Sequence, residues 1–140
     1  MILRCSSCAT ANRVPAERLH EVARCGRCKT ELAPLAMPLP IHSAVEFDEL
    51  VGSTKLPMLV DFWAQWCGPC HTVAPQLASV AKKRRGALIV AKLDTDEVPV
   101  VAARFGIRSI PTMILFSGGR EAKRVTGAMP AAAIEQGLSL

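Results

Sequence analysis

The stretch that decides the fold is Met58–Pro75, MLVDFWAQWCGPCHTVAP. Its first six residues are an apolar run of strand-forming side chains, interrupted by one acid, Asp61. Apolar residues then recur at helical spacing, which predicts a helix over 68–85. Cys67 and Cys70 therefore lie where a buried strand ends and a helix begins.

A helix N-terminus suits a thiolate at Cys67. Main-chain N–H groups and the helix dipole favour an anion there, which lowers the pKa of the thiol. Pro69 fits the first helical turn, because the N–H that it lacks would have no partner there. Cys70, one turn on, is expected to face inward and to be less exposed. These positions predict that Cys67 attacks a substrate disulfide and that Cys70 resolves the mixed disulfide.

Three further residues are candidates for the same site. Asp61, a lone carboxylate in an apolar strand, is expected to be buried, with a raised pKa, and to accept the proton of Cys70. The alternative is an ordinary, partly exposed strand acid. Lys92, in the apolar run 88–93, is a candidate partner for that charge. Pro111 precedes a strand and is a candidate cis peptide, which would expose main-chain groups for pairing with a substrate chain.

The same Cys-x-x-Cys spacing occurs twice nearer the N-terminus, as CSSC and CGRC. The 16 residues between these pairs fall within the range typical of paired zinc-binding claws. A tetrahedral Zn²⁺ takes four thiolates, and a short segment with few large apolar side chains needs such an ion to fold. We therefore predict one structural Zn²⁺ ion, held by Cys5, Cys8, Cys25 and Cys28.

Disulfides, oxidisable free thiols and an iron–sulfur cluster are the alternatives for these four cysteines. Neither pair follows a buried strand and neither has a proline between its thiols, so nothing in the sequence activates them. His20 lies midway between the pairs and is an alternative ligand. With four cysteines available, we expect His20 to be a solvated side chain.

The proline-rich segment Ala33–Pro40, APLAMPLP, predicts an extended connector between two units. We expect a zinc-binding N-terminal domain with its linker over 1–37 and a second domain over 38–140. The second domain is expected to have strands at 58–63, 88–93, 112–116 and 120–126, and helices at 44–52, 68–85, 96–105 and 129–140. Asp96 is the expected N-cap of the third helix. This order predicts an α/β domain with a mixed sheet covered by helices on both faces.

The composition fits one well-cored domain with a small appendage: 140 residues, 50% hydrophobic and 21% charged. The net charge is +5, but its only dense basic run, Lys82–Arg85, is predicted to be a solvated helix end rather than a nucleic-acid patch. Tyr is absent, which gives little support for base stacking. No signal-peptide pattern or membrane-length apolar run occurs. We expect a cytoplasmic monomer that binds neither nucleic acid nor membranes.

From about residue 41 to 137 the sequence resembles the thioredoxin family. The matching pieces are VDFWAQWCGPC, Pro75 in the following helix, AKLDTDE, FGIRSIPT, LFSGG and VTGA. The combination of WCGPC with a later IPT is highly specific. The N-terminal CSSC…NRVP…CGRCK resembles the zinc-binding extension of the bacterial thioredoxin 2 subgroup.

The resemblance implies a thioredoxin fold with a zinc-ribbon-like appendage, and a general disulfide reductase without an organic cofactor. Electrons would come from NADPH through thioredoxin reductase and would pass to disulfide-containing client proteins. The resemblance assigns the nucleophile to Cys67, the resolving thiol to Cys70, the buried acid to Asp61 and the cis-proline to Pro111. It places a flat docking rim at Trp66, Gly68, Pro69, Ile110 and Gly127.

The chain departs from the family at His71, where Lys or Arg is common, so redox potential or partner preference is expected to differ. We expect His71 to point away from the cysteine pair and to modulate the surface, rather than to act as a general base. The last helix is also short. Two other functions stay open: a zinc-based redox sensor or redox-regulated holdase, and a disulfide oxidase or isomerase. Gly-Pro between the thiols, which the family associates with a reducing potential, and the missing signal peptide disfavour an oxidase.

Overall fold

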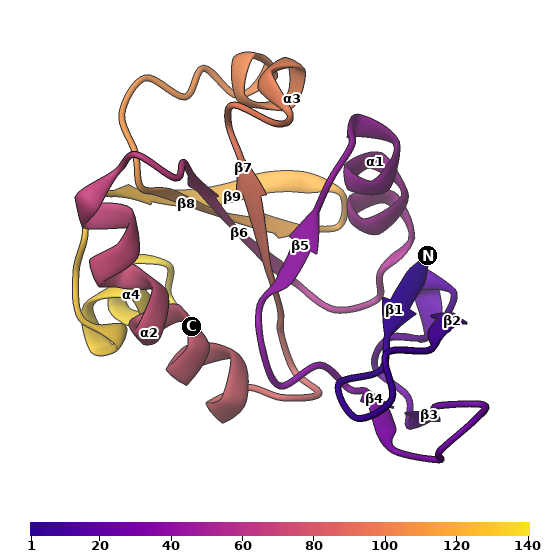
Figure 1. Cartoon of the computed structure of the whole chain (residues 1–140). Helices are drawn as coiled ribbons and strands as arrows, with labels where there is room; N and C mark the ends of the chain where they lie inside the picture. Colours follow the sequence, from indigo (N-terminus) through magenta and orange to yellow (C-terminus); the bar gives the residue numbers. More distant parts are fainter.

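A five-stranded sheet forms the centre of the molecule, in a computed structural model that describes all 140 residues (Figure 1). The strand order is β5-β7-β6-β8-β9. β7 pairs in parallel with β5 and β6, whereas β8 is antiparallel to both β6 and β9, so the predicted mixed sheet is confirmed. The strands are β5 (Leu39–Ile41), β6 (Met58–Trp63), β7 (Ile89–Asp94), β8 (Thr112–Ser117) and β9 (Arg120–Thr126).

Helices cover both faces of this sheet, also as predicted (Figure 1). They are α1 (Ala44–Ser53), α2 (Gly68–Lys83), α3 (Pro99–Arg104) and α4 (Ala131–Gly137). Side chains alternate along β6: Met58, Val60 and Phe62 pack with α1 and α3, and Leu59 packs with α2 and α4. Asp61 follows Leu59 by two residues, so its carboxylate points to the same face of the sheet, toward α2.

Two predicted elements differ in detail. The third helix begins at Pro99 with Val98 as its N-cap, so the prediction of Asp96 as N-cap is wrong. The reason is that Asp96 lies in the preceding turn, where its N–H donates to Asp94 Oδ1 at 2.8 Å. β5 lies partly in the segment predicted to be a connector. Pro40 is tolerated there because β5 is an edge strand, which needs no donor on its outer side.

The N-terminal unit consists of two short antiparallel ribbons and one turn of 3-10 helix. Its elements are β1 (Ile2–Arg4), β2 (Ala11–Arg13), η1 (Ala16–Arg18), β3 (Ala23–Arg24) and β4 (Glu31–Ala33). Leu3 and Leu19 of this unit belong to the same apolar cluster as Phe47 and Leu50 of α1. The two units therefore share buried surface, and the predicted division at residues 37 and 38 stays a prediction.

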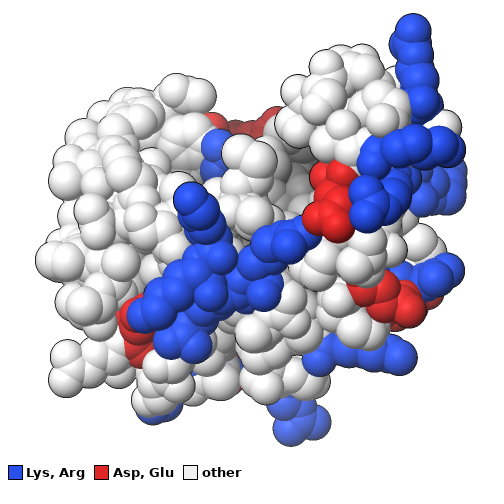
Figure 2. All heavy atoms as spheres, turned by 90° about the horizontal axis from the view of Figure 1, so that it is seen from below, with Lys and Arg blue, Asp and Glu red and all other residues white.

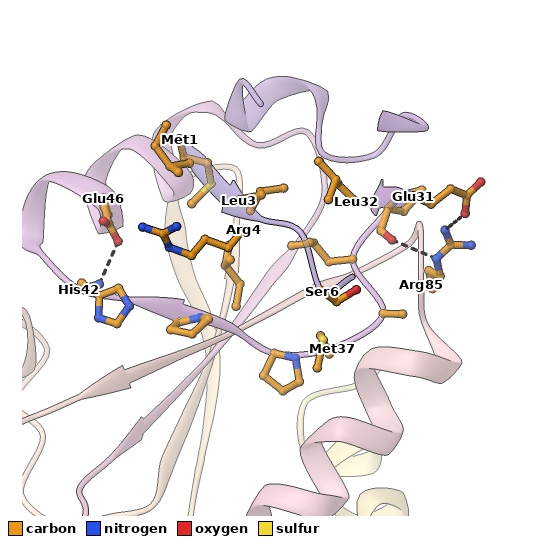
Figure 3. Close-up of a pocket in the computed structure, with 17 residues that line it drawn as sticks. Met1, Leu3, Arg4, Ser6, Glu31, Leu32, Met37, His42, Glu46 and Arg85 are labelled. Atoms are coloured by element: carbon orange, nitrogen blue, oxygen red, sulfur yellow. Dashed lines mark hydrogen bonds and ion pairs between the residues drawn. The ribbon is translucent and has the colours of Figure 1, made fainter. Parts of the chain in front are cut away.

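An open pocket of about 640 Å³ lies at this junction (Figure 3). Its walls come from β1, β4 and the connector that leads into β5. In Figure 3 the Arg4 side chain extends toward Glu46 and His42, whereas Glu31 and Arg85 lie at the other end of the pocket. Arg85, at the rim, donates to Glu31 Oε2 at 2.8 Å and to the Pro34 carbonyl at 2.9 Å. None of the cysteines lines this pocket.

The basic run Lys82–Arg85 lies at the C-terminal end of α2, as predicted. Figure 2, which views the molecule from below, shows a band of Lys and Arg side chains across this face. Lys83 and Arg84 both pair with Glu135 of α4, at 3.1 and 3.0 Å, which ties the ends of the two helices together. The cations also lie where they complement the negative end of the helix dipole. No helix of the structure has the length and apolarity to cross a membrane.

The shared cluster predicts that the two units unfold together. Replacing Leu19, which is fully buried, by Ala should lower the free energy of unfolding by about 2–4 kcal/mol and leave a single transition. The matched control is Val45→Ala on the exposed face of α1, for which we expect a change below about 0.5 kcal/mol. Chemical denaturation followed by tryptophan fluorescence and circular dichroism measures both. Early loss of the N-terminal ribbons alone would contradict the shared core.

Candidate functional site

The junction between β6 and α2 places two cysteines side by side. Cys67 is the N-cap of α2, and its Sγ accepts the N–H of Cys70 at 3.2 Å. The two Cα atoms are 5.3 Å apart and the sulfurs lie at disulfide-bonding distance. Cys67 is 4% exposed and Cys70 2%, so the predicted difference in exposure is small. Trp63 and Ile110 pack against the small buried cluster that Cys67 and Cys70 form with Ala64, which explains why Cys67 is also buried.

The segment before β8 lies across from this pair. Cys67 Sγ is 3.7 Å from the carbonyl oxygen of Ile110, and the Ile110–Pro111 peptide bond is cis, as expected from the sequence. The Pro111 carbonyl accepts the N–H of Gly127 at 2.8 Å. Ile110, a predicted rim residue, therefore lies beside Cys67, and Gly127, another, is hydrogen-bonded to the adjoining Pro111.

The other predicted rim residues precede or begin α2. Gly68 and Pro69 are exposed and form its first turn. Trp66 is 71% exposed, and its Nε1–H donates to Asp96 Oδ2 at 2.9 Å. Sequence reasoning missed this contact of Asp96, because a helix cap was the simpler interpretation of an acid near a predicted helix start.

Asp61 is buried on the face of the sheet that α2 covers. It is 5% exposed, and its Oδ1 has no hydrogen-bond partner. Burial raises the pKa of Asp61 to about 7, and the positive charge of Lys92 opposes this rise only in part. The structure thus has a buried carboxyl group with a raised pKa at this position, as the sequence predicted, rather than a partly exposed acid.

Lys92 is the neighbour of Asp61 in the parallel ladder between β6 and β7. Lys92 follows Val90 by two residues, and Val90 packs with α2. The side chains of Lys92 and Asp61 therefore point to the same face of the sheet. Lys92 forms no ion pair with Asp61, and its Nζ lies 5.5 Å from the centre of the Trp63 ring instead. The predicted partnership is therefore an electrostatic influence across the ladder, not a contact.

The four N-terminal cysteines converge into one cluster. The sulfurs of Cys5, Cys8, Cys25 and Cys28 all lie within 4.8 Å of one another. Two of the separations are 3.4 Å (Cys5 to Cys28) and 3.6 Å (Cys8 to Cys25). Four sulfurs at about 2.3 Å from a tetrahedral Zn²⁺ would be about 3.8 Å apart, so the donor set fits this ion. His20 is not part of the cluster, which excludes it as the alternative ligand in this arrangement.

The two N-terminal cysteine pairs lie in two turns of the same conformation. Ala9 and Lys29, which follow the second cysteines, have positive φ, and their N–H groups donate to the carbonyls of Cys5 and Cys25 at 2.9 and 3.0 Å. Hydroxyl oxygens of Thr10 and Thr30 accept from the second thiol of each pair at 3.1 and 3.2 Å. The signal for these contacts was the repeated pattern Cys-x-x-Cys-x-Thr, in CSSCAT and CGRCKT.

Hydrogen bonds to sulfur favour the thiolate form of Cys25. The N–H groups of Cys28 and Arg27 lower the pKa of Cys25 to about 6. Asn12 Nδ2 also donates to Cys25 Sγ at 3.5 Å, while Asn12 Oδ1 accepts the N–H of Gly26 at 3.0 Å. Metal ligands are commonly oriented by such outer contacts. Sequence reasoning missed Asn12, since its role depends on β2 lying beside the second turn.

Comparison with known proteins assigns both units. The thioredoxin family model matches residues 38–139, and the model described as "Thioredoxin 2, N-terminal" matches residues 4–30. Thioredoxin C-3 of Corynebacterium nephridii is 40% identical over 138 residues, which cover 99% of this chain and 93% of that protein.

Two further matches cover different shares of this chain and of the related protein. A bifunctional thioredoxin reductase/thioredoxin of Mycobacterium leprae is 46% identical over 110 residues, which are 79% of this chain but 24% of that protein. Among solved structures, a mutant thioredoxin from Halobacterium salinarum NRC-1 superposes with a TM-score of 0.67 at 32% identity. This match covers 77% of this chain and 96% of that one.

Asn12 offers a test of the metal cluster that leaves its ligands intact. Asn12→Ala removes the hydrogen bonds to Cys25 Sγ and to the N–H of Gly26, so zinc affinity should fall about tenfold. Competition with a chromophoric chelator measures the affinity. Ser6→Ala, in the first claw, removes a side chain that makes no hydrogen bond and should leave it unchanged. Equal affinities for all three proteins would contradict the role of Asn12.

The buried acid predicts how stability depends on pH. The pKa of Asp61 is about 7 in the folded state, against an ordinary value of 3.8, so the ionised form is disfavoured by folding. Its contribution to stability is greatest below about pH 4 and is lost as pH rises through about 7. Asp61→Asn removes this penalty and should raise the free energy of unfolding at pH 8 by about 2–4 kcal/mol, with little change at pH 4.

Denaturant titrations at the two pH values check this prediction. The control is Asp48→Asn, an exposed carboxylate paired with Arg104, for which the effect should be small and similar at both. A gain for Asp61→Asn that is as large at pH 4 as at pH 8 would show that ionisation is not its cause.

Proposed function

The chain belongs to the thioredoxin family, whose members are disulfide oxidoreductases, and from this premise we propose that it reduces protein disulfides by dithiol–disulfide exchange at Cys67 and Cys70. The observation that carries the proposal is the position of Cys67 as N-cap of α2, with the N–H of Cys70 donating to its sulfur. This arrangement stabilises a thiolate at Cys67 when the pair is reduced.

The first step is attack on the client. The thiolate of Cys67 forms a bond to one sulfur of a client disulfide, and the client's other sulfur leaves as a thiolate that takes up a proton. The product is a mixed disulfide between Cys67 and the client. The N–H of Cys70 and the positive end of α2 stabilise negative charge on Cys67 before the attack.

The second step releases the client. Cys70 gives up its proton and attacks Cys67 Sγ, so that the client's remaining sulfur leaves as a thiolate and Cys67–Cys70 becomes a disulfide. We assign the proton acceptor to ionised Asp61. Two observations support this role: Asp61 faces α2, and its pKa of about 7 suits proton transfer near neutral pH. Lys92 favours the ionised form of Asp61 through its charge.

We assign client binding to the exposed and half-buried residues around the buried pair. Trp66 supplies a large apolar surface, and the small or rigid residues beside it permit close approach of a client chain. The assigned contacts are Trp66, Gly68, Pro69, Ile110 and Gly127, with Pro111 placing Ile110 beside Cys67.

Regeneration needs an external electron donor. We propose thioredoxin reductase, which takes its electrons from NADPH, and the bifunctional reductase/thioredoxin relative supports this pairing. The Cys₄ cluster would hold one structural Zn²⁺ ion per chain. The four cysteines of that cluster form no disulfide, which suits a reducing compartment, so we place the protein in the cytoplasm. We further propose that it is a monomer.

A zinc-based redox sensor is the second candidate function. It is favoured by the exposure of Cys28, since an oxidant can reach that ligand. In such a sensor, oxidation would release the metal and expose the apolar surface that the N-terminal unit shares with α1.

Reduction of insulin separates the two functions. Cys67→Ser removes the attacking thiol and should abolish reduction, by about 10³-fold or more, as measured by insulin precipitation with dithiothreitol as donor. A Cys5→Ser/Cys8→Ser double variant should retain activity, because neither cysteine takes part in the exchange between Cys67 and Cys70. The opposite pattern would refute the reductase and favour the sensor.

A further inference from the structure

His71 makes a hydrogen bond to the main chain just before the cysteine pair. Its Nε2 is 2.7 Å from the carbonyl oxygen of Gln65. A carbonyl oxygen can only accept, so Nε2 carries the hydrogen, in the neutral ring as well as in the imidazolium ion. His71 lies in the first turn of α2, and helical side chains lean toward the helix N-terminus. The ring is exposed, as expected, but it is held against the loop.

Two other contacts fix the position of His71. It meets the ring of Trp63 edge-on, with centroids 6.1 Å apart and an angle of 78° between the planes. The main-chain N–H of His71 donates to the carbonyl of Cys67 at 3.4 Å. His71 therefore binds the carbonyls of Gln65 and Cys67, on the two sides of Trp66.

The Gln65 carbonyl belongs to the peptide group that joins Gln65 to Trp66. The orientation of that group sets the direction in which the Trp66 side chain leaves the main chain. From the other side, Asp96 accepts the indole N–H of Trp66 at 2.9 Å. A large side chain that is 71% exposed is thus held at both ends, at its main chain by His71 and at its indole by Asp96.

We propose that His71 is a positioning residue for client recognition. Its hydrogen bond to Gln65 holds Trp66 in the orientation that a protein client meets, and it spares the client the cost of ordering this side chain. The inference rests on the proposed reductase function and extends it. None of the hydrogen bonds of His71 reaches a sulfur, so the exchange reaction itself should not depend on it.

Two disulfides of different size test the proposal. Insulin presents a chain that docks on the surface around Trp66, whereas 5,5′-dithiobis(2-nitrobenzoate) is too small to need it. His71→Ala should lower the second-order rate constant of the reduced protein with insulin about fivefold, and change that with the small disulfide less than about twofold. The matched control is Thr72→Ala, whose hydroxyl donates only within α2, to the carbonyl of Gly68, and both rate constants should stay unchanged.

Rescue and spectroscopy separate positioning from a general structural effect. His71→Gln keeps a side-chain N–H that can donate to the Gln65 carbonyl, so it should restore at least about half of the insulin rate. The indole N–H of Trp66 should exchange with deuterium about tenfold faster in His71→Ala than in the original protein, because the hydrogen bond to Asp96 is then less well held.

An unchanged insulin rate in His71→Ala, or failure of His71→Gln to restore it, would overturn the proposal. Equal losses with both disulfides would also overturn it, because they would place His71 in the exchange chemistry. By contrast, a wild-type protein that reduces neither disulfide would refute the reductase function itself.

Discussion

The structure depends on one constraint, the passage of the chain from the middle strand of the sheet directly into the N-terminus of α2. β6 pairs with β7 on one side and β8 on the other, so it is fixed in place along its whole length. Only four residues separate its last residue, Trp63, from Gly68, the first residue of α2. Cys67 is therefore held at the helix N-terminus by the most rigid part of the fold.

Context gives the three Cys-x-x-Cys pairs different chemistry. Cys67 and Cys70 lie within bonding distance of each other, above a sheet face that carries a buried carboxyl group. In the N-terminal unit the short sulfur separations run between the pairs, from Cys5 to Cys28 and from Cys8 to Cys25. Sulfurs from two different turns that lie close together can bind one metal ion. Two sulfurs of a single turn that lie within bonding distance suit thiol–disulfide exchange.

Much of this arrangement was predictable from the sequence. The apolar run with a single acid at Asp61 predicted a buried carboxyl group with a raised pKa, and the paired Cys-x-x-Cys turns predicted the cluster of four sulfurs. These signals are local, or depend on spacing alone. The position of Pro111 before a strand made it a candidate cis peptide, and the family resemblance assigned the same role to it and added Ile110 to the docking rim.

The contacts that the sequence did not predict depend on tertiary packing. Asp96 binds Trp66 instead of capping a helix, and Asn12 reaches a sulfur of the other claw, because distant segments happen to meet there. Leu39–Ile41 became a strand through pairing with β7, although its proline argued for a connector. The bond from His71 to Gln65 likewise required knowing how the first turn of α2 lies over the preceding loop.

The central claim is that two cysteines exchange electrons while four hold an ion. Thiol titration together with zinc analysis, on the reduced protein before and after mild peroxide, tests it most directly. The account predicts one zinc per chain, two thiols that react at once, and four that react only after a chelator is added. Peroxide should remove the two reactive thiols and leave the zinc bound. Six equally reactive thiols, or loss of zinc before loss of the Cys67–Cys70 pair, would contradict it.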